Sequence, residues 1–246
     1  HRSLTPDRFS HHDRLKKLTA DMPRLICLIP IRKGSKGVPD KNMKILGGKP
    51  LVAWVVDAIT ASHTAAEIWV ATDDDRAERY LAEARPLTRV YRRSEASATD
   101  TAPVIEVVRE FIDAVRPAPD DMLVLAQATS PFTSPDDFRR LRQSIETAKA
   151  DSYIACLRTK RFVWNPDGTP ASYRLDAKPM RQAFSGTLIE TGAFYASSVG
   201  AIERSRSLLS GRIEIVETSP DTDVDIDESI DWLKAEALAK AITMIQ

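Results

Sequence analysis

The sequence predicts an α/β fold in three layers, with a mostly parallel sheet and helices on both of its faces. Short apolar runs of β type alternate with segments of helical periodicity, and the first run leads into a basic loop that contains glycine. Such alternation joins parallel strands through helical crossovers. The predicted strands are Leu25–Ile31, Glu67–Ala71, Met122–Gln127 and Asp151–Leu157, and the predicted helices are Leu51–Ile59, Arg76–Ala84, Thr101–Val115 and Pro135–Lys149.

Two of the predicted helices begin with recognisable capping signals. Thr101 is followed by Pro103, and Ser134 is followed by Pro135 and two aspartates. A hydroxyl side chain at the cap, an early proline and acids in the first turn all favour a helix start.

The pattern weakens between residues 159 and 190, where an Asn-Pro-Asp-Gly turn lies among prolines and scattered aromatics. We interpret this stretch as an insertion into the fold. A strand pair, Ala193–Ala196 and Arg212–Val216, and a helix, Glu228–Thr243, complete a predicted domain of residues 22–246.

The composition excludes several classes of protein. The 246 residues are 43% hydrophobic, enough for one large core, and the 35 Lys and Arg residues balance 35 Asp and Glu residues. Long-range attraction to nucleic acid or to a membrane is therefore not expected. Cys27 and Cys156 each lie in an apolar run, which fits buried free thiols and a cytoplasmic location better than a disulfide framework.

Residues 1–21 are polar and basic and lack the apolar core of a secretory signal. We expect a flexible extension, with Met22 as the natural start of the chain. Three histidines, His1, His11 and His12, lie in this stretch, but without metal-ligand spacing we expect them to be solvated. No run reaches the roughly 20 apolar residues of a membrane span.

The loop after the first predicted strand, within Ile29–Leu51, is the strongest functional signal. Its basic side chains surround two glycines: Arg32, Lys33, Lys36 and Lys41 lie among Gly34 and Gly37. Glycine lets backbone N–H groups approach closely spaced phosphate oxygens, and Lys and Arg add charge-assisted hydrogen bonds. The loop has neither Walker A nor G-x-G-x-x-G spacing. We predict a phosphate-binding loop of another kind; the alternative is a solvated basic loop.

An acidic segment near the C-terminus is the candidate metal site. Asp225 and Asp227 are two residues apart, so an extended backbone places both carboxylates on one face. Such oxygens suit Mg²⁺ or Mn²⁺. The alternative is a solvated turn that caps the last helix, and the neighbouring Asp221, Asp223 and Asp231 are either supporting groups or surface charge.

Four separated segments resemble the acylneuraminate cytidylyltransferase family, the CMP-sialic acid synthetases. They are the loop Ile29–Asn42, which reads IPIRKGSKGVPDKN, the segment Arg92–Glu95 followed by Asp100, the QATSP segment Gln127–Pro131, and the DID motif Asp225–Asp227. Their order and separation match the family from Arg24 to Ala239. The resemblance implies a Rossmann-like fold of the nucleotide-diphospho-sugar transferase type.

The same resemblance implies a reaction. CMP would pass from CTP to the anomeric hydroxyl of a sialic-type 2-keto sugar acid, N-acetylneuraminate first of all, and pyrophosphate would be released with the help of a divalent metal. Pseudaminate, legionaminate and Kdo are alternative acceptors. A non-catalytic nucleotide-binding protein of the same fold is an alternative from another class. An active enzyme requires that Asp225 and Asp227 face the loop Ile31–Lys41 across a cleft.

The resemblance also assigns roles to residues. Arg32, Lys41 and Asp227 would form the catalytic set, with Asp225 and Asp227 as metal ligands. The predicted substrate contacts are Ser35, Lys36, Asn42, Arg93, Asp100, Gln127, Arg181, Gln182 and Tyr195. We identify no general base.

Several of these residues could instead have a purely structural role, and two positions depart from the family pattern. Gln127 could satisfy a sheet edge, Arg181 could be a surface charge, and Tyr195 could be an ordinary strand residue. Thr191 stands where the family usually has Asn, and Lys33 replaces a small or amide residue. Family members are homodimers whose inserted segment reaches the partner's sugar site, so the insertion at 159–190 would be a dimerisation segment.

Overall fold

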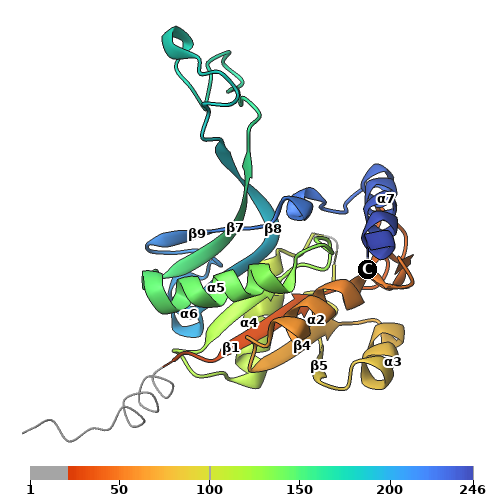
Figure 1. Cartoon of the computed structure of the whole chain (residues 1–246). Helices are drawn as coiled ribbons and strands as arrows, with labels where there is room; N and C mark the ends of the chain where they lie inside the picture. Colours follow the sequence, from red (N-terminus) through yellow and green to blue (C-terminus); the bar gives the residue numbers. More distant parts are fainter. Residues whose placement is uncertain (1–21, 100, 246) are drawn as a thin grey trace, which may run out of the picture.

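The computed structural model describes residues 22–99 and 101–245 and has three layers built on one large sheet (Figure 1). The expectations for residues 1–21 and for Asp100 lie outside this part. The seven strands of the sheet have the order β5-β4-β1-β6-β8-β7-β9. Their bounds are β1 Leu25–Pro30, β4 Glu67–Thr72, β5 Thr88–Arg92, β6 Met122–Ala126, β7 Ser152–Thr159, β8 Thr187–Ser198 and β9 Ile213–Glu217.

The sheet is mostly parallel, as predicted. β1 lies between β4 and β6, and β5 and β9 also pair in parallel with their neighbours β4 and β7. β8 alone runs antiparallel to its neighbours, β6 and β7. The predicted pairing of Ala193–Ala196 with Arg212–Val216 is wrong, because β7 lies between β8 and β9 and pairs with both. Strand β5 escaped prediction because its sequence, TRVYR, is too polar to form an apolar run.

Helices cover both faces of the sheet, as predicted. Their bounds are α2 Leu51–Ser62, α3 Asp75–Ala84, α4 Val104–Val115, α5 Pro135–Ala148, α6 Val199–Ser205 and α7 Ser229–Ile245. One buried cluster takes residues from α2, α3 and α5, and a second, on the other face, takes residues from α4 and α6. Short elements connect them: 3-10 turns η1 Lys41–Met43, η2 Leu175–Ala177 and η3 Pro220–Asp223, and the small hairpin β2 Ile45–Leu46 with β3 Lys49–Pro50.

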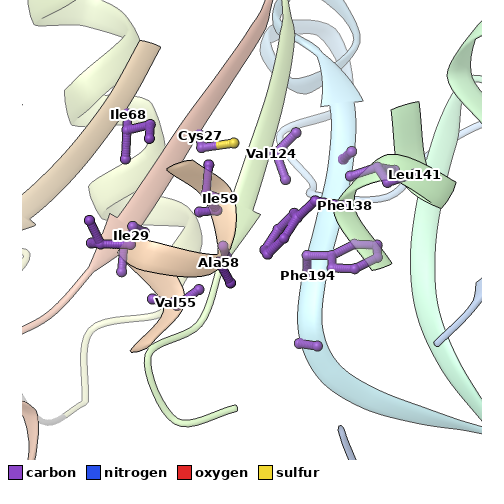
Figure 2. Close-up of a cluster of buried hydrophobic side chains, with 14 of the residues drawn as sticks. Cys27, Ile29, Val55, Ala58, Ile59, Ile68, Val124, Phe138, Leu141 and Phe194 are labelled. Carbon is purple, nitrogen blue, oxygen red and sulfur yellow. The ribbon is translucent and has the colours of Figure 1, made fainter. Parts of the chain in front are cut away.

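The larger buried cluster joins the two halves of the sheet (Figure 2). Phe138 of α5 packs on Phe194 of β8, with ring centroids 5.6 Å apart. Cys27 lies in the same cluster, and burial raises the pKa of its thiol to about 12. Cys156 is also a buried free thiol, and burial raises its pKa too, so both cysteines are structural.

One predicted helix start is confirmed and one is wrong. At α5, Ser134 Oγ accepts a hydrogen bond from Asp137 N at 3.2 Å, and Ser134 N donates to Asp137 Oδ2 at 2.8 Å, which closes a capping box. Helix α4 begins only at Val104, after Pro103, and not at Thr101. Pro103 disfavours helical backbone in the residue before it, Ala102, so the helix cannot extend back to Thr101.

The segment 160–186 extends away from the sheet between β7 and β8 (Figure 1), close to the predicted insertion. Aromatic residues stabilise it: Phe162 packs on Tyr173 and on Phe184, each at 5.0 Å between centroids, and Trp164 packs on Tyr173 at 5.9 Å. This small cluster gives the segment a structure of its own outside the main core.

A third buried cluster brings the C-terminal helix onto the loop after β1. Trp232, Ala235 and Ala239 of α7 pack with Ile226 against loop and hairpin residues that include Val38 and Leu46. In the part of the chain that the structure describes, no helix combines the length and apolarity that crossing a membrane needs.

Replacing Phe138 with Ala should lower the free energy of unfolding by about 3–5 kcal/mol, because a fully buried ring leaves the largest cluster. Urea unfolding followed by circular dichroism measures this change. Leu87→Ala, at a side chain that is 77% exposed, is the control, and we expect it to change stability by less than about 0.5 kcal/mol. Equal effects of the two substitutions would contradict this description of the core.

Candidate active site

The loop after β1 is folded by its own polar side chains. Ser35 Oγ donates to Val38 O at 2.7 Å and accepts from Lys41 N at 2.9 Å, while Asn42 Nδ2 donates to Arg32 O at 3.0 Å. Ser35 and Asn42, both predicted as substrate contacts, thus shape the loop that presents the basic residues. Lys36 lies exposed on the same loop.

Lys41 connects this loop to the C-terminal segment. Its side chain is buried, and Nζ donates to Ile226 O and to Asp227 Oδ1, the latter at 3.2 Å. The two residues of this ion pair are 186 positions apart in the sequence. The expectation that Asp227 faces the loop is therefore confirmed, although the two segments touch directly instead of facing each other across a cleft.

Gly37 allows this contact by its lack of a side chain. A Cβ atom at position 37 would overlap the carbonyl oxygen of Asp227. The backbone of Gly37 does not have a positive φ, so glycine is required here by close approach alone.

The segment after β6 contacts the backbone between Asp225 and Asp227. Ile226 N donates to Thr129 O at 2.8 Å, which fixes the backbone between the two acidic residues. Partial burial raises the pKa of the Asp225 carboxyl above its usual range; the charge of Asp227 adds to this rise, and Lys41 opposes it. A cation placed between the two carboxylates would relieve their mutual repulsion.

The donor set fits a magnesium ion that also binds phosphate. Among residues 22–99 and 101–245, no group of three or more His, Cys, Asp or Glu side chains could hold a metal ion. A metal ion at Asp225 and Asp227 would therefore have at most these two carboxylates as ligands from the described part of the chain. Mg²⁺ is usually bound by one or two carboxylates, with substrate phosphates and water completing its octahedron.

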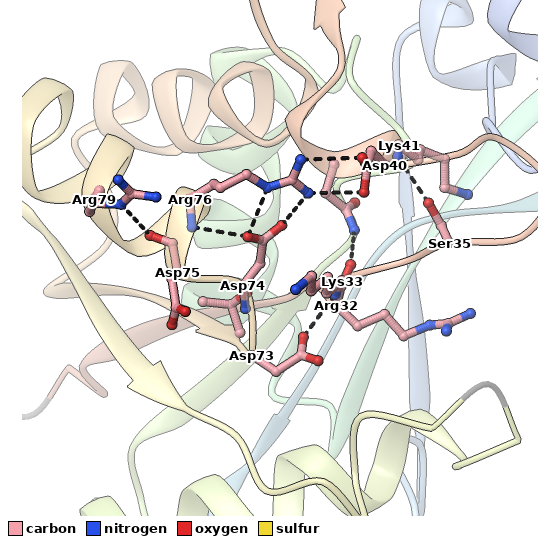
Figure 3. A network of polar contacts seen from close by, with 12 residues as sticks. Arg32, Lys33, Ser35, Asp40, Lys41, Asp73, Asp74, Asp75, Arg76 and Arg79 are labelled. Carbon is pink, nitrogen blue, oxygen red and sulfur yellow. Dashed lines mark hydrogen bonds and ion pairs between the residues drawn. The ribbon is translucent and has the colours of Figure 1, made fainter.

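Arg93 and Arg32 lie beside the loop. The guanidinium of Arg93 is buried and donates to Ile31 O at 3.2 Å and to the backbone of Ser97, so it ties the end of β1 to the segment after β5. Burial lowers the pKa of Arg93, and the nearby charge of Arg32 lowers it further. The Arg32 side chain points away from Asp73 and Asp74 (Figure 3).

A pocket of about 330 Å³ opens next to Asp225. Its lining residues come from the ends of β6 and β7, from β8 and from η3: Gln127, Leu157, Ile189, Glu190, Thr191, Gly192, Tyr195, Thr222, Asp223 and Asp225. Gly192 has φ +71°, and a Cβ there would lie 3.8 Å from both Asp225 Oδ2 and Gln127 Nε2. The pocket thus brings Gln127 and Tyr195, both predicted, together with Asp225.

An irregularity in β8 shapes the pocket. Ile154 pairs with Tyr195 and Cys156 with Glu190, so a single residue of β7 opposes the stretch 191–194. Thr191 Oγ1 supports this stretch by donating to Ala155 O and accepting from Ala193 N, both at 3.4 Å. A hydroxyl at position 191 is therefore used for backbone shape.

Tyr195 separates this pocket from a neighbouring apolar one. Its hydroxyl donates to Glu190 Oε1, and burial, followed by this hydrogen bond, raises the pKa of Tyr195 far above its usual range. The second pocket, of about 370 Å³, shares Gln127 and Tyr195 and is otherwise lined mostly by apolar side chains such as Ile105 and Leu208.

Arg181 and Gln182 lie elsewhere. Both are exposed in the segment 160–186, which extends away from the sheet (Figure 1). Among the described residues that line the 330 Å³ pocket, none is Lys or Arg. Within one chain, the structure does not bring this predicted pair to the pocket.

Sequence reasoning missed a group of residues at the turn between β4 and α3. Lys33 N donates to Asp73 Oδ1 at 2.8 Å, and Arg76 pairs with Asp40 and Asp74 (Figure 3). Three consecutive aspartates, one residue after the predicted strand Glu67–Ala71, were the available signal. The contacts of this turn with the loop could not be read from the sequence, because Lys33 and Asp73 are 40 positions apart and Asp40 and Arg76 are 36 positions apart.

Comparison with known proteins identifies relatives over most of the chain. A sequence model of the cytidylyltransferase family matches residues 26–163. N-acylneuraminate cytidylyltransferase B of Danio rerio is 39% identical over 217 residues, which are 85% of this chain and 50% of that protein. The enzyme of the same name from Oncorhynchus mykiss is 33% identical over 235 residues, 91% of this chain and 53% of that protein. The chain thus spans about half the length of these curated relatives.

Two further comparisons bear on acceptor and fold. CMP-N,N'-diacetyllegionaminic acid synthase of Legionella pneumophila is 38% identical over 122 residues, 47% of this chain and 50% of that protein. A solved CMP:2-keto-3-deoxy-manno-octonic acid synthetase, complexed with CTP, superposes with a TM-score of 0.63 and 19% identity, covering 89% of this chain and 99% of that one. At this identity the superposition supports the fold alone.

Gly37→Ala should lower the free energy of unfolding by about 1–3 kcal/mol, because a methyl group must displace the Asp227 carbonyl and the helix that follows it. Thermal and urea unfolding measure the loss. The same variant should show faster amide exchange in residues 225–232 than the parent protein. Unchanged stability together with unchanged exchange would mean that these two backbone segments do not touch.

Proposed function

We propose that this chain, which belongs to the cytidylyltransferase family, transfers CMP from CTP to the anomeric hydroxyl of a sialic-type 2-keto sugar acid and releases pyrophosphate. One observation carries the proposal: a buried lysine of a basic loop meets the carboxylate of Asp227, two residues after Asp225. Cations and carboxylates side by side are what nucleotidyl transfer requires, because the triphosphate must be neutralised before attack.

In this proposal Arg32 and Lys41 hold the triphosphate of CTP. Lys41 is fixed by two hydrogen bonds, so its ammonium group is already oriented when the nucleotide arrives. Binding of phosphate would replace or share the contact with Asp227, whose side chain is 73% exposed and can turn to another ligand. The basic loop thus places the nucleotide, and the reaction occurs where its α-phosphorus faces the sugar pocket.

We assign Mg²⁺ or Mn²⁺ to Asp225 and Asp227. The ion, when bound, neutralises phosphate oxygens and lowers the pKa of a coordinated hydroxyl. Asp225 also lines the sugar pocket, so the same carboxylate would contact the metal and border the acceptor. Asp225 and Asp227 would hold the ion at the border of the pocket, and we identify no separate general base.

The pocket beside Asp225 would hold the sugar acid, with the Gln127 amide as a hydrogen-bonding group. The adjoining apolar pocket suits an acyl group on the acceptor, which favours N-acetylneuraminate and related acylated acids over Kdo. The relatives named N-acylneuraminate cytidylyltransferase also favour N-acetylneuraminate as the acceptor. The similarity to the legionaminic acid synthase supports legionaminate as the alternative acceptor.

We further propose a homodimer in which the segment 160–186 of one copy reaches the sugar pocket of the other. A sugar acid and pyrophosphate are anions, yet the described lining of the pocket carries Glu190, Asp223 and Asp225 and no Lys or Arg. The segment carries Arg181, and it exposes Trp164 and Met180 as apolar contact surface. Arg181 from the partner would then bind the carboxylate of the acceptor.

The proposal is tested by measuring pyrophosphate release with each of the four ribonucleoside triphosphates against N-acetylneuraminate, legionaminate, pseudaminate and Kdo. We expect release only with CTP, with N-acetylneuraminate as the best acceptor. Release should stop when the divalent metal is removed with EDTA and should return when Mg²⁺ is added. No CTP-dependent release with any acceptor would refute the proposed function.

Asp227→Asn should lower kcat by more than about 100-fold, since substitutions even outside the direct ligand shell of a metal cost roughly 10- to 100-fold. The amide keeps the shape of the side chain and lies at an exposed position, so the melting temperature should stay near that of the parent. Asp221→Asn, at a nearby exposed aspartate, is the matched control and should keep full activity. Near-normal kcat in Asp227→Asn would remove this residue from the metal site.

A further inference from the structure

We propose that Arg76 is a positioning residue for the phosphate-binding loop, which it holds through Asp40 against the turn between β4 and α3. The inference rests on the proposed function for what the loop binds, but the contact itself is independent of any ligand. Arg76 lies outside the loop, 36 positions from Asp40, and the sequence analysis gave it no role.

The guanidinium of Arg76 lies between two carboxylates (Figure 3). Nη1 and Nη2 donate to Asp40 Oδ2 and Oδ1 at 3.2 and 2.9 Å. Nε and Nη2 donate to Asp74 Oδ1 and Oδ2 at 3.1 and 2.8 Å. Both pairs are bidentate, which fixes the plane of the guanidinium as well as its charge.

Asp74 is the fixed side of this arrangement. It is buried, and its Oδ1 accepts from Arg76 N at 2.9 Å as the N-cap of α3. Its own N–H donates to Thr72 Oγ1 at 3.0 Å, which anchors the turn to the end of β4. Hydrogen bonds from Arg76 hold the pKa of the Asp74 carboxyl below its usual range, so the carboxylate stays charged. Arg76 is thereby attached to the rigid part of the fold.

Asp40 is the loop residue of this contact, and it directly precedes Lys41 in the sequence. Its backbone has φ +54°, a left-handed conformation that costs most residues other than glycine free energy. Its carbonyl accepts from Met43 N and Lys44 N at 3.0 and 3.1 Å and so begins the turn η1. The side chain does not cap this turn, because it is used by Arg76 instead. Arg76 therefore stabilises the backbone geometry that directs Lys41 and Asn42.

The same turn also holds the start of the loop. Asp73 Oδ1 accepts from Lys33 N at 2.8 Å, so Asp73 and Arg76 secure residues 33 and 40, the two ends of the loop segment between them. Hydrogen bonds from Arg76 lower the pKa of both Asp40 and Asp74, and the positive charge of Lys33 adds to this effect. Lys33 thus belongs electrostatically to this support and faces acidic residues of the protein.

The test compares Asp40→Asn, Arg76→Gln and the double variant with the parent protein, and uses Arg79→Gln as the matched control. Arg79 lies one turn along α3 and donates to the backbone of Asp75, outside the contact with Asp40. Two quantities are measured. Amide hydrogen exchange of residues 38–44 is followed in the ligand-free protein, and KM for CTP, KM for the sugar acid and kcat are determined with the active enzyme.

We expect each single variant to exchange faster in residues 38–44 and to raise KM for CTP about tenfold, since small displacements of a binding group carry costs of this order. KM for the sugar acid should stay unchanged, because both substitutions lie on the nucleotide side of the proposed site. The double variant should be no worse than Arg76→Gln, because both substitutions break the same contact. Arg79→Gln should match the parent in every measurement.

Two results would overturn the inference. Unchanged exchange in both single variants would show that the loop does not need this contact. A raised KM for CTP in Arg76→Gln together with normal values in Asp40→Asn would mean that Arg76 contacts the nucleotide itself and does not act through Asp40. Absence of any CTP turnover in the parent would refute the proposed function instead, while the exchange measurement would still decide whether Arg76 supports the loop.

Discussion

The contact between Lys41 and the backbone and side chain of residues 226 and 227 is the interaction on which the site depends. Lys41 Nζ binds Ile226 O and Asp227 Oδ1 from a buried position, and Gly37 lets the two backbones approach. Beneath this polar contact, Val38, Ile226 and Trp232 pack in one apolar cluster. Burial of apolar surface thus stabilises the arrangement that brings the cation and the carboxylates together. The ion pair alone would contribute little free energy, because Asp227 is exposed to solvent.

The neighbouring elements extend this contact into a site with two chemically different sides. On the side of β4 and α3, charged residues hold the basic loop at both ends. On the side of β8, the irregular stretch 191–194 opens a polar pocket beside Asp225. A nucleotide on the first side and a sugar acid on the second would meet at Asp225 and Asp227. This division explains why the residues of the site come from several separate segments.

Local sequence patterns predicted the parts of the fold that depend on local physics. The apolar run of β1 and the helix start at Ser134 both follow from neighbouring residues, and the structure confirms them. The pairing of β8 and β9 with β7 depends on strands that are distant in the sequence, so local patterns could not predict it. The late start of α4 depends on Pro103, whose effect the helical periodicity of the segment hid. Among site residues, Lys41 and Asp227 were predicted to be near each other only through the family resemblance. Arg76 was missed because its partner, Asp40, lies in a different segment.

The central claim is that the Lys41 loop and the carboxylates of Asp225 and Asp227 form a single site for a metal-bound triphosphate. A crystal structure with CTP and Mn²⁺ tests it most directly, because the anomalous signal of manganese locates the ion independently of the nucleotide. We expect a manganese peak bound by both carboxylates, with the triphosphate on Lys41 and Arg32. A manganese peak away from Asp225 and Asp227, or a triphosphate bound outside the loop after β1, would contradict it.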